Sequence, residues 1–357
     1  ADVVVDASGN VYLTAKNGNG AGTHQVRIYS DFENGVLAAK IGNAQSSCHT
    51  FQGCTSLQGG DFIAPHGLDI LNNKLYVLDG NRKIQIFDVD IPKPALTLNS
   101  SDGGSCSEIG TWSSSSKTCY LEIDLTDQII IESNDITLDG NGKSITGGYD
   151  TGSGMGDSTF REGVKLDGRT GVTVKNLIIN NVGMGISLTS SENNLIQGNT
   201  FSEVGGGIEL NNSPSNTITL NTINSRDGTG IDVDDSNANI ITSNTQYGAS
   251  TGISVSNSNQ LTIDGNSFIN NYKGIYLNGV AEISVTNNVF ESNSSAYPNW
   301  WPTSDTAIQI DGGTGHTISS NTISGSSDAG IRVSADTVTI HDNMISDATV
   351  GIFAVGS

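Results

Sequence analysis

Two residue landmarks recur along the C-terminal two thirds of the chain with a shared period of about 22 residues. The first is a small residue directly before Val or Ile, at Gly163, Gly185, Gly207, Gly230, Gly252, Gly274, Ala307, Gly330 and Gly351. The second is an asparagine, at Asn199, Asn221, Asn244, Asn266, Asn288, Asn321 and Asn343. Both series contain the same 11-residue insertion between residues 288 and 307. Because two independent markers keep one period, the chain is built from a structural repeat.

Each repeat consists of short segments with alternating apolar and polar residues, separated by Gly, Asn and Ser. This alternation predicts short β-strands. In "GIELN", Ile208 and Leu210 are expected to face inward and Glu209 outward. A unit this short buries its apolar face only by stacking on its neighbours, about 4.8 Å apart. We expect the repeated asparagine at a turn, where its amide bonds the equivalent residues above and below.

Residues 121–357 therefore resemble a right-handed parallel β-helix. The repeat class is the one found in periplasmic copper-maturation proteins and in carbohydrate-binding or sugar-hydrolysing proteins. The segment "CSEIGTWSSSSKTCYLEIDLTDQIIIESNDITLDGNGKSITG" resembles the entry into such helices. The resemblance implies an all-β fold of eight or nine coils with almost no α-helix. It says little of function, because enzymes, adhesins and scaffolds share this fold.

The first part of the chain has a different pattern. "DVVVDASGNVYLTAK" and "PHGLDILNNKLYVLDG" resemble blades of an NHL-type β-propeller. Only two blade-like units are present, whereas a closed propeller needs at least about four. We expect residues 1–98 to form a small propeller-like β module, residues 99–120 a disulfide-tied linker and helix entry, and residues 121–357 the β-helix.

The four cysteines fall into two close pairs, Cys48 with Cys54 and Cys106 with Cys119. Three pairings are possible, and two local bonds are favoured because each pair flanks a short Gly- and Ser-rich segment. The spacing lacks a CxxC motif, which argues against zinc. Disulfides favour an extracellular or cell-surface location, and reduced thiols are the alternative. Asn99, Asn211 and Asn293 begin N-x-S sequons, which are candidate glycosylation sites on a surface.

The formal net charge of −21 argues against a nucleic-acid partner, because phosphates attract a basic surface. Such a charge keeps a protein soluble or collects cations. No stretch is long and apolar enough to predict a membrane span.

Acidic residues gather at the outward positions of two neighbouring repeats. Glu209 and Asp232 are predicted to lie one coil apart, with Asp234 and Asp235 beside them. Glu209, Asp232 and Asp234 are candidates for the acid and nucleophile of a glycosidase. Asp232, Asp234 and Asp235 are alternatively candidates for a Ca²⁺ site. The favoured interpretation is a solvated acidic face, because no basic residue or Gly-His-Gly motif accompanies these acids.

The insertion "SAYPNWWPTSD" interrupts the period and contains Tyr297, Trp300 and Trp301. Exposed aromatic side chains stack on sugar rings or anchor protein interfaces. A loop that folds back over the helix wall is the alternative.

The favoured function at this point is an extracellular structural protein without enzymatic activity. Its copies are expected to join head to tail into a filament, sheath or layer, or to act as an adhesin that contacts cell-surface glycans. This hypothesis rests on the apolar, uncapped sequences at the two ends, "ADVVVD" and "ISDATVGIFAVGS". The alternative is a carbohydrate-active or carbohydrate-binding protein, such as a polysaccharide lyase or a glycoside hydrolase.

Overall fold

The structure is a computed structural model. It describes residues 3–5, 11–16, 24–31, 36–41, 67–71, 74–78, 84–88, 96–148, 162–226, 228–292, 306–326 and 328–355. The chain divides into two compact units, Ala1–Pro94 and Ala95–Ser357. Within the described residues no helix is long and apolar enough to span a membrane.

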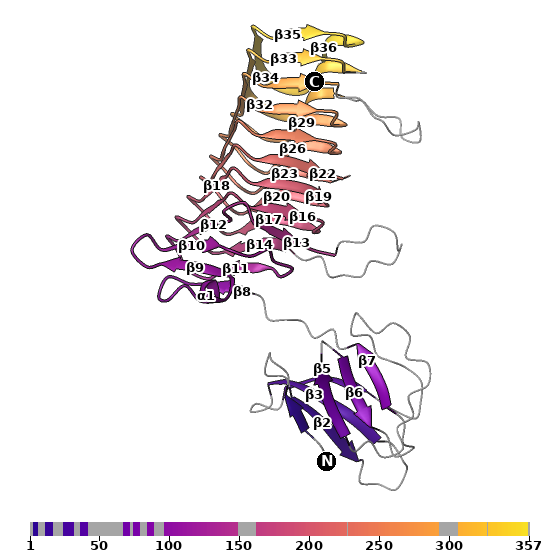
Figure 1. Cartoon of the computed structure of the whole chain (residues 1–357). Helices are drawn as coiled ribbons and strands as arrows, with labels where there is room; N and C mark the ends of the chain where they lie inside the picture. Colours follow the sequence, from indigo (N-terminus) through magenta and orange to yellow (C-terminus); the bar gives the residue numbers. More distant parts are fainter. Residues whose placement is uncertain are drawn as a thin grey trace. The chain divides into compact units, whose positions relative to one another are not determined.

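The first unit contains two antiparallel sheets (Figure 1). One has four strands in chain order: β1 (Val3–Val5), β2 (Val11–Lys16), β3 (His24–Asp31) and β4 (Val36–Ile41). The other has three: β5 (Gly67–Leu71), β6 (Lys74–Leu78) and β7 (Ile84–Asp88). Tyr12, Leu75 and Val77 are buried. The alternating segments predict strands that pair with their neighbours in the sequence, and both sheets have this order. The sheets do not show a propeller.

The second unit begins with a disulfide-tied segment. It comprises β8 (Leu96–Leu98), the short helix α1 (Cys106–Ile109), β9 (Gly110–Ser113) and β10 (Thr118–Leu121). Cys106 and Cys119 form the predicted disulfide, with their Cα atoms 5.8 Å apart. The bond joins α1 to β10, and β9 pairs antiparallel with β10. Strand β8 pairs in parallel with β11 (Ile129–Ile131), so residues 96–98 belong to the coiled stack and not to the N-terminal sheets.

The rest of the second unit is a parallel β-helix, which confirms the main fold prediction (Figure 1). Each coil contributes strands to three walls, here called faces 1, 2 and 3. Face 1 consists of β8, β11, β14 (Glu162–Asp167), β17 (Met184–Thr189), β20 (Gly206–Asn211), β23 (Thr229–Asp234), β26 (Thr251–Ser256), β29 (Lys273–Asn278), the first parts of β32 (Thr306–Ser319) and β34 (Ala329–His341), and β36 (Val350–Ala354).

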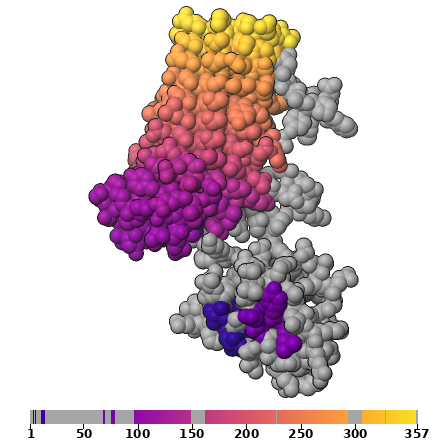
Figure 2. Space-filling model, viewed as in Figure 1, coloured from indigo at the N-terminus to yellow at the C-terminus, as the bar shows by residue number. Residues whose placement is uncertain are grey.

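Faces 2 and 3 complete each coil. Face 2 consists of β12 (Thr137–Asp139), β15 (Thr173–Lys175), β18 (Leu195–Gln197), β21 (Thr217–Thr219), β24 (Ile240–Thr242), β27 (Thr262–Asp264), β30 (Ser284–Thr286) and the ends of β32 and β34. Face 3 consists of β13 (Ser144–Thr146), β16 (Ile178–Asn180), β19 (Thr200–Val204), β22 (Thr222–Ser225), β25 (Thr245–Tyr247), β28 (Ser267–Ile269), β31 (Val289–Glu291), β33 (Thr322–Ser324) and β35 (Met344–Ser346). In Figure 2 the coils follow the sequence order from one end of this unit to the other.

The register of the strands reproduces the sequence period. Ile186 pairs with Ile208 and Ile208 with Ile231, whereas Ile275 pairs with Ile308 across the insertion. These side chains are buried and form a continuous apolar column inside face 1. The stack has about ten coils, more than the eight or nine predicted. The difference arises because the coils of β8 and β11 precede the first Gly-Val landmark.

The repeated asparagines form the predicted ladder at the corner between faces 2 and 3. The side-chain amide of Asn199 donates to Oδ1 of Asn221 at 3.0 Å, and Asn221 donates to Asn244 at the same distance. The Asn221 amide also donates to the carbonyl of Ile196. Its Oδ1 accepts the backbone N–H of Asn199 at 2.9 Å. The ladder continues through Asn343 and satisfies backbone groups that the corner would leave without partners.

The residue before each ladder asparagine adopts a left-handed backbone conformation. These residues have φ between 54° and 63°: Gly198, Leu220, Ser243, Gly265, Asn287, Ser320 and Asp342. A left-handed residue turns the chain sharply, and only two of the seven are glycine. A non-glycine residue in this conformation costs roughly 1–2 kcal/mol. The hydrogen bonds of the adjacent asparagine offset that cost.

Candidate functional site

The predicted acidic residues lie on the outer surface of face 1. Glu209 on β20 pairs by its Cα with Asp232 on β23, one coil apart as predicted. Their neighbours along each strand, Ile208, Leu210 and Val233, are buried, so both acids point away from the core. The same outward column runs from Lys165 to Arg332 in consecutive coils.

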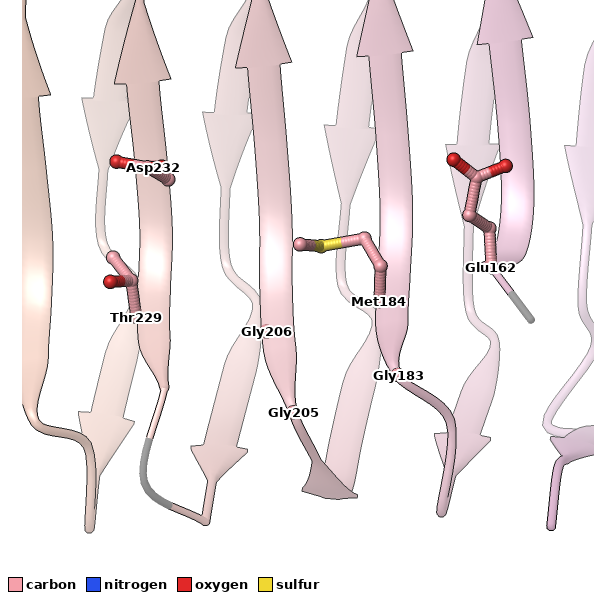
Figure 3. A pocket seen from close by; sticks show the side chains of 7 residues that line it. All are labelled: Glu162, Gly183, Met184, Gly205, Gly206, Thr229 and Asp232. Atoms are coloured by element: carbon pink, nitrogen blue, oxygen red, sulfur yellow. The ribbon is translucent and has the colours of Figure 1, made fainter. Parts of the chain in front are cut away.

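An open pocket of about 420 Å³ lies beside these acids (Figure 3). Its lining consists of Glu162, Gly183, Met184, Gly205, Gly206, Thr229 and Asp232. Glu162, Met184 and Gly206 occupy equivalent positions on consecutive strands. Because Gly206 has no side chain, the wall is indented there. The Met184 side chain reaches across toward β20, so its thioether forms an apolar border of the pocket (Figure 3).

The local electrostatics raise the pKa of both paired acids. Burial is the main cause for Glu209, and the negative charges of Asp232 and Glu162 raise its pKa further. Burial is also the main cause for Asp232; a hydrogen bond from Ser254 opposes the rise and the charge of Asp234 adds to it. A carboxyl group that holds its proton to higher pH is suited to proton donation.

The third acid at this site, Glu162, is held by hydrogen bonds at both carboxylate oxygens. Ser187 donates to Oε1 at 2.9 Å, and the Gln128 amide donates to Oε2 at 2.8 Å. These bonds fix the position of the Glu162 carboxyl group, two strands away from Glu209 on the same outer surface.

Asp234 and Asp235 are placed differently from Asp232. The Asp234 Oδ1 accepts hydrogen bonds from Ser256 at 2.7 Å and from Asn257 at 2.8 Å, and these bonds lower the Asp234 pKa. Asp235 has a φ of 49°, at the corner where the chain leaves β23. Within the described part of the chain, no group of three or more His, Cys, Asp and Glu side chains is arranged to hold a metal ion. The Ca²⁺ site at Asp232, Asp234 and Asp235 stays a prediction without a supporting cluster.

Several predicted residues lie outside the described residues: Cys48, Cys54, Asn293, Tyr297, Trp300 and Trp301. The disulfide between Cys48 and Cys54 and the role of the insertion stay predictions. Of the other sequons, Asn99 accepts hydrogen bonds from Ser101 and Asp102 in a surface turn. Asn211 is exposed, but the hydroxyl of its sequon residue Ser213 is buried and donates to the Leu188 carbonyl.

Sequence analysis missed Glu162, Met184 and Gly206 as parts of this site. Each of these three residues lies one position before a Gly landmark, and the repeat register aligns them in one column. A second outward column, one residue before each Gly landmark, was the signal that could have identified them. The pocket itself depends on Gly206 occupying a position where neighbouring coils have Met184 and Thr229.

Soft metal ligands are few near this pocket. Met184 is the one soft donor in its lining, and Cys106 and Cys119 are joined as a disulfide. His316 is buried, and burial lowers its pKa, while His341 contacts Asp342 at 2.8 Å. Copper is bound by sets of Cys, Met and His side chains. The described residues bring no such set together and do not fit a copper centre.

The fold resembles that of 64 solved protein chains. One is a DFA-IIIase from Arthrobacter chlorophenolicus A6 in complex with GF2, at 15% identity and a TM-score of 0.53, over 64% of this chain and 64% of the enzyme. Another is an alginate lyase from Paenibacillus sp. str. FPU-7, at 14% identity and a TM-score of 0.47, over 67% of this chain and 98% of the lyase. At these identities the likeness concerns the fold alone. No functionally curated protein matches the sequence significantly.

A protein-family model matches residues 122–300 and 233–357, which together make up more than half of the chain. The matched ranges cover the repeats that build faces 1, 2 and 3, including the pocket and its acids. They overlap within the stack, as expected where one repeat aligns to several coils. The family is described as periplasmic copper-binding protein (NosD), and the chain belongs to this NosD family.

Proposed function

We propose that the protein binds a glycan along the outer surface of face 1 and hydrolyses a glycosidic bond with Glu209 and Asp232. The observation that carries this proposal is a pair of outward carboxyl groups on adjacent strands, both with raised pKa, next to an open pocket. Isolated surface acids in a solvated face keep an ordinary pKa, so the pair is unlike its surroundings. This is the carbohydrate-active alternative of the sequence analysis rather than the favoured structural role.

Glu209 is the proposed general acid. Burial and the charge of Asp232 raise the pKa of Glu209, which favours its protonated form. That proton passes to the glycosidic oxygen as the bond to the leaving sugar breaks. Glu162, whose carboxylate oxygens accept from Ser187 and Gln128, raises the pKa of Glu209 further through its charge.

Asp232 is the proposed nucleophile. Neighbouring strands lie about 4.8 Å apart, close to the carboxyl separation of about 5–5.5 Å in retaining glycosidases. Its carboxylate would bond to the anomeric carbon as the leaving sugar departs. Water, deprotonated by Glu209, would then hydrolyse this intermediate and restore Asp232. The product is therefore expected to retain the anomeric configuration of the substrate.

The sugar unit in the pocket is proposed to be neutral. Glu162 and Asp232 line that position and Glu209 lies one coil from Asp232, so a uronate carboxylate placed there would be repelled. Lyases that act on uronates neutralise the carboxylate with a cation, and the described residues around the pocket provide none. Hydrolysis is accordingly proposed in place of elimination.

The test is reducing-sugar release from a panel of neutral and acidic polysaccharides. We expect Glu209→Gln and Asp232→Asn to lower turnover at least about 100-fold, the size of a lost acid–base contribution. Asp234→Asn is the matched control, because Asp234 lies on the same strand but is bonded to Ser256 and Asn257. Full turnover by Glu209→Gln on a substrate that the unchanged protein cleaves would exclude these roles.

The location proposed for the protein is outside the cytoplasm, in the periplasm or at the cell surface. The family description names the periplasm, and the disulfide between Cys106 and Cys119 is typical of oxidising compartments. Copper enters no step of the proposal, because the described residues do not fit a copper centre. We also propose that the coils wind right-handed, as parallel crossovers almost always do, and that the N-terminal sheets are propeller-like blades.

Head-to-tail assembly of copies into a filament, sheath or layer stays a separate hypothesis. The side chains of Ile352 and Phe353 on β36 are 49% and 43% exposed. Light scattering and electron microscopy of the whole protein test the hypothesis. A concentration-independent monomer would exclude it.

A further inference from the structure

A second cluster of polar side chains lies on the outer surface of face 1, beyond the carboxylate pair. Tyr276 on β29, Gln309 on β32 and Arg332 on β34 occupy the same column as Asp232. Lys273 lies three residues before Tyr276 and holds its ammonium 4.5 Å from the centre of the Tyr276 ring. We call Lys273, Tyr276, Gln309 and Arg332 the cationic cluster. Its members come from three consecutive coils and form one continuous patch.

The two positive charges of the cationic cluster are incompletely neutralised. No carboxylate of the described residues makes an ion pair with Lys273, and the one ion pair of Arg332, with Asp328, is long at 3.9 Å. Charge-assisted hydrogen bonds measure about 2.7–2.9 Å. Burial is the main cause that lowers the Lys273 pKa; the charge of Asp311 opposes this shift and the charge of Arg332 adds to it. Asp311, which accepts a hydrogen bond from Gln309, and Asp328 lie near these two cations, but neither makes a short ion pair with Lys273 or Arg332.

Two polar atoms of the cluster also lack hydrogen-bond partners. Gln309 is 7% exposed, and its Nε2 donates to Asp311 at 2.6 Å, but its Oε1 has no donor. The Nε of Arg332 is buried without an acceptor. A buried polar atom without a partner costs about 1–3 kcal/mol, so native proteins rarely leave one unless a ligand or water completes it. The patch thus offers two cationic donors and one free acceptor.

We propose that the cationic cluster is a binding subsite for a sugar that carries a negatively charged substituent, a carboxylate or a sulfate. Lys273 and Arg332 donate to the anionic oxygens, and Gln309 Oε1 accepts from a hydroxyl of the same sugar. The Tyr276 ring holds Lys273 in place through the cation–π contact. The role of this subsite in a longer glycan rests on the proposed function, whereas the binding itself does not.

The spacing of the two sites fits one extended ligand. From Asp232 to Tyr276 the column advances two strands, and to Arg332 four, or about 10 Å and 19 Å at the usual strand spacing. Both sites lie on one outer surface. A linear glycan running along the stack would therefore place a neutral unit between the acids and an anionic unit several sugars away.

The subsite is tested with monosaccharides that differ only at C6: glucose, glucuronate and glucose 6-sulfate, each titrated against the whole protein by ligand-observed NMR. We expect both charged sugars to bind at least about tenfold more tightly than glucose, the size of one charge-assisted hydrogen bond. The tighter of the two identifies the substituent. Lys273→Met and Arg332→Gln should each reduce charged-sugar binding about tenfold.

Two matched variants make the test specific. Lys165→Met removes a cation from the same column at the opposite side of the acids and should leave charged-sugar binding unchanged. Glu209→Gln should also leave it unchanged, while abolishing the proposed hydrolysis. Charged-sugar binding that survives both Lys273→Met and Arg332→Gln would overturn the subsite, and so would equal binding of glucose or no binding of either charged sugar. If the protein hydrolyses a glycan but does not bind charged sugars, the subsite proposal fails and the proposed function stands. If it binds charged sugars but hydrolyses no glycan, the proposed function fails and the subsite stands.

Discussion

Buried polar residues of this stack have opposite energetic roles according to whether they have hydrogen-bond partners. The ladder asparagines from Asn199 to Asn321 are buried, and Asn221, for example, satisfies backbone groups of two coils. Gln246 is equally buried but lies in the apolar column of face 3, between Ile223 and Phe268. Both of its side-chain polar atoms lack partners. The same amide group is stabilising at the corner and destabilising inside face 3.

Replacing Gln246 by leucine should therefore stabilise the protein. The substitution removes two unpaired polar atoms at nearly constant volume, which is expected to raise the free energy of unfolding by about 1–2 kcal/mol. Asn221→Leu should lower it by at least about 2 kcal/mol, because the Ile196 carbonyl and Asn199 N–H lose their partners. Denaturant unfolding of both variants measures these changes. A destabilised Gln246→Leu would show that a water or polar partner satisfies Gln246.

The raised pKa of Glu209 predicts a pH-dependent effect of Glu209→Gln. The folded protein binds this proton more tightly than the unfolded chain, whose carboxyl titrates near 4.5. The stability from Glu209 is thus fully present below that pH and is lost as the pH rises through the folded pKa. Glu209→Gln should increase stability at pH 7 and leave it unchanged below about pH 4. Solvent screening limits the gain to less than about 1 kcal/mol.

Asp234→Asn is the matched comparison, because its effect on stability at neutral pH is expected to have the opposite sign to that of Glu209→Gln. Hydrogen bonds from Ser256 and Asn257 lower the Asp234 pKa, so its stabilisation is present above the unfolded pKa and lost on acidification. The Asn variant should therefore be less stable at neutral pH and no different in acid. Thermal unfolding across this pH range measures both variants. Parallel behaviour of the two would contradict the assigned electrostatics.

At the scale of one strand, two adjacent glycines of β20 have different functions. A Cβ at Gly206 would point outward and lie 2.6 Å from the terminal methyl of Met184, a flexible group that lines the pocket. A Cβ at Gly207 would point inward and overlap the backbone carbonyl oxygen of Gly230. Gly207 is required for the close approach of consecutive coils, whereas Gly206 keeps the pocket open.

Substitution of each glycine by alanine should separate these functions. Gly207→Ala should lower the free energy of unfolding by about 1–3 kcal/mol through overpacking against the next coil. Gly206→Ala should change it by less than about 0.5 kcal/mol, since the Met184 methyl can move. Gly206→Ala should nevertheless weaken glycan turnover, because its methyl group narrows the pocket. Turnover unchanged in Gly206→Ala would place the substrate elsewhere on face 1.

The repeat predicted the elements of the stack and the neighbouring acids Glu209 and Asp232, but not the other residues around them. Ile208, Leu210 and the ladder asparagines follow from spacing, because each has an equivalent in every coil. Glu162, Lys273 and Gln309 have no such equivalents, and their importance depends on what the neighbouring coil places beside them. The raised pKa of Glu209 likewise depends on burial, which a pattern of outward residues does not contain. The β8 coil was missed because it lacks the Gly-Ile landmark.

At the scale of the whole molecule, the chain carries a net charge of −21, and its like charges repel one another. We expect added salt to stabilise the fold by screening this repulsion. NaCl and CaCl₂ at equal ionic strength should raise the melting temperature similarly. Among the described residues, no group of three or more His, Cys, Asp and Glu side chains is arranged to hold a metal ion. A rise specific to CaCl₂ and absent with MgCl₂ would contradict this prediction. Loss of that rise in Asp232→Asn would locate the ion at the predicted site.

Because the register of the coils is constant, the number of repeats sets the distance between the two proposed subsites. From β20 to β29 consecutive coils pair residue for residue with offsets of 22 or 23, so duplication of one repeat between β26 and β29 would preserve the pairings on either side. The cationic cluster would then move about 4.8 Å from the acids without a change in either group. Such a duplication would thus alter the length of a glycan that could bind both proposed subsites at once. Such a lineage could change specificity in whole steps, with no substitution at a contact residue.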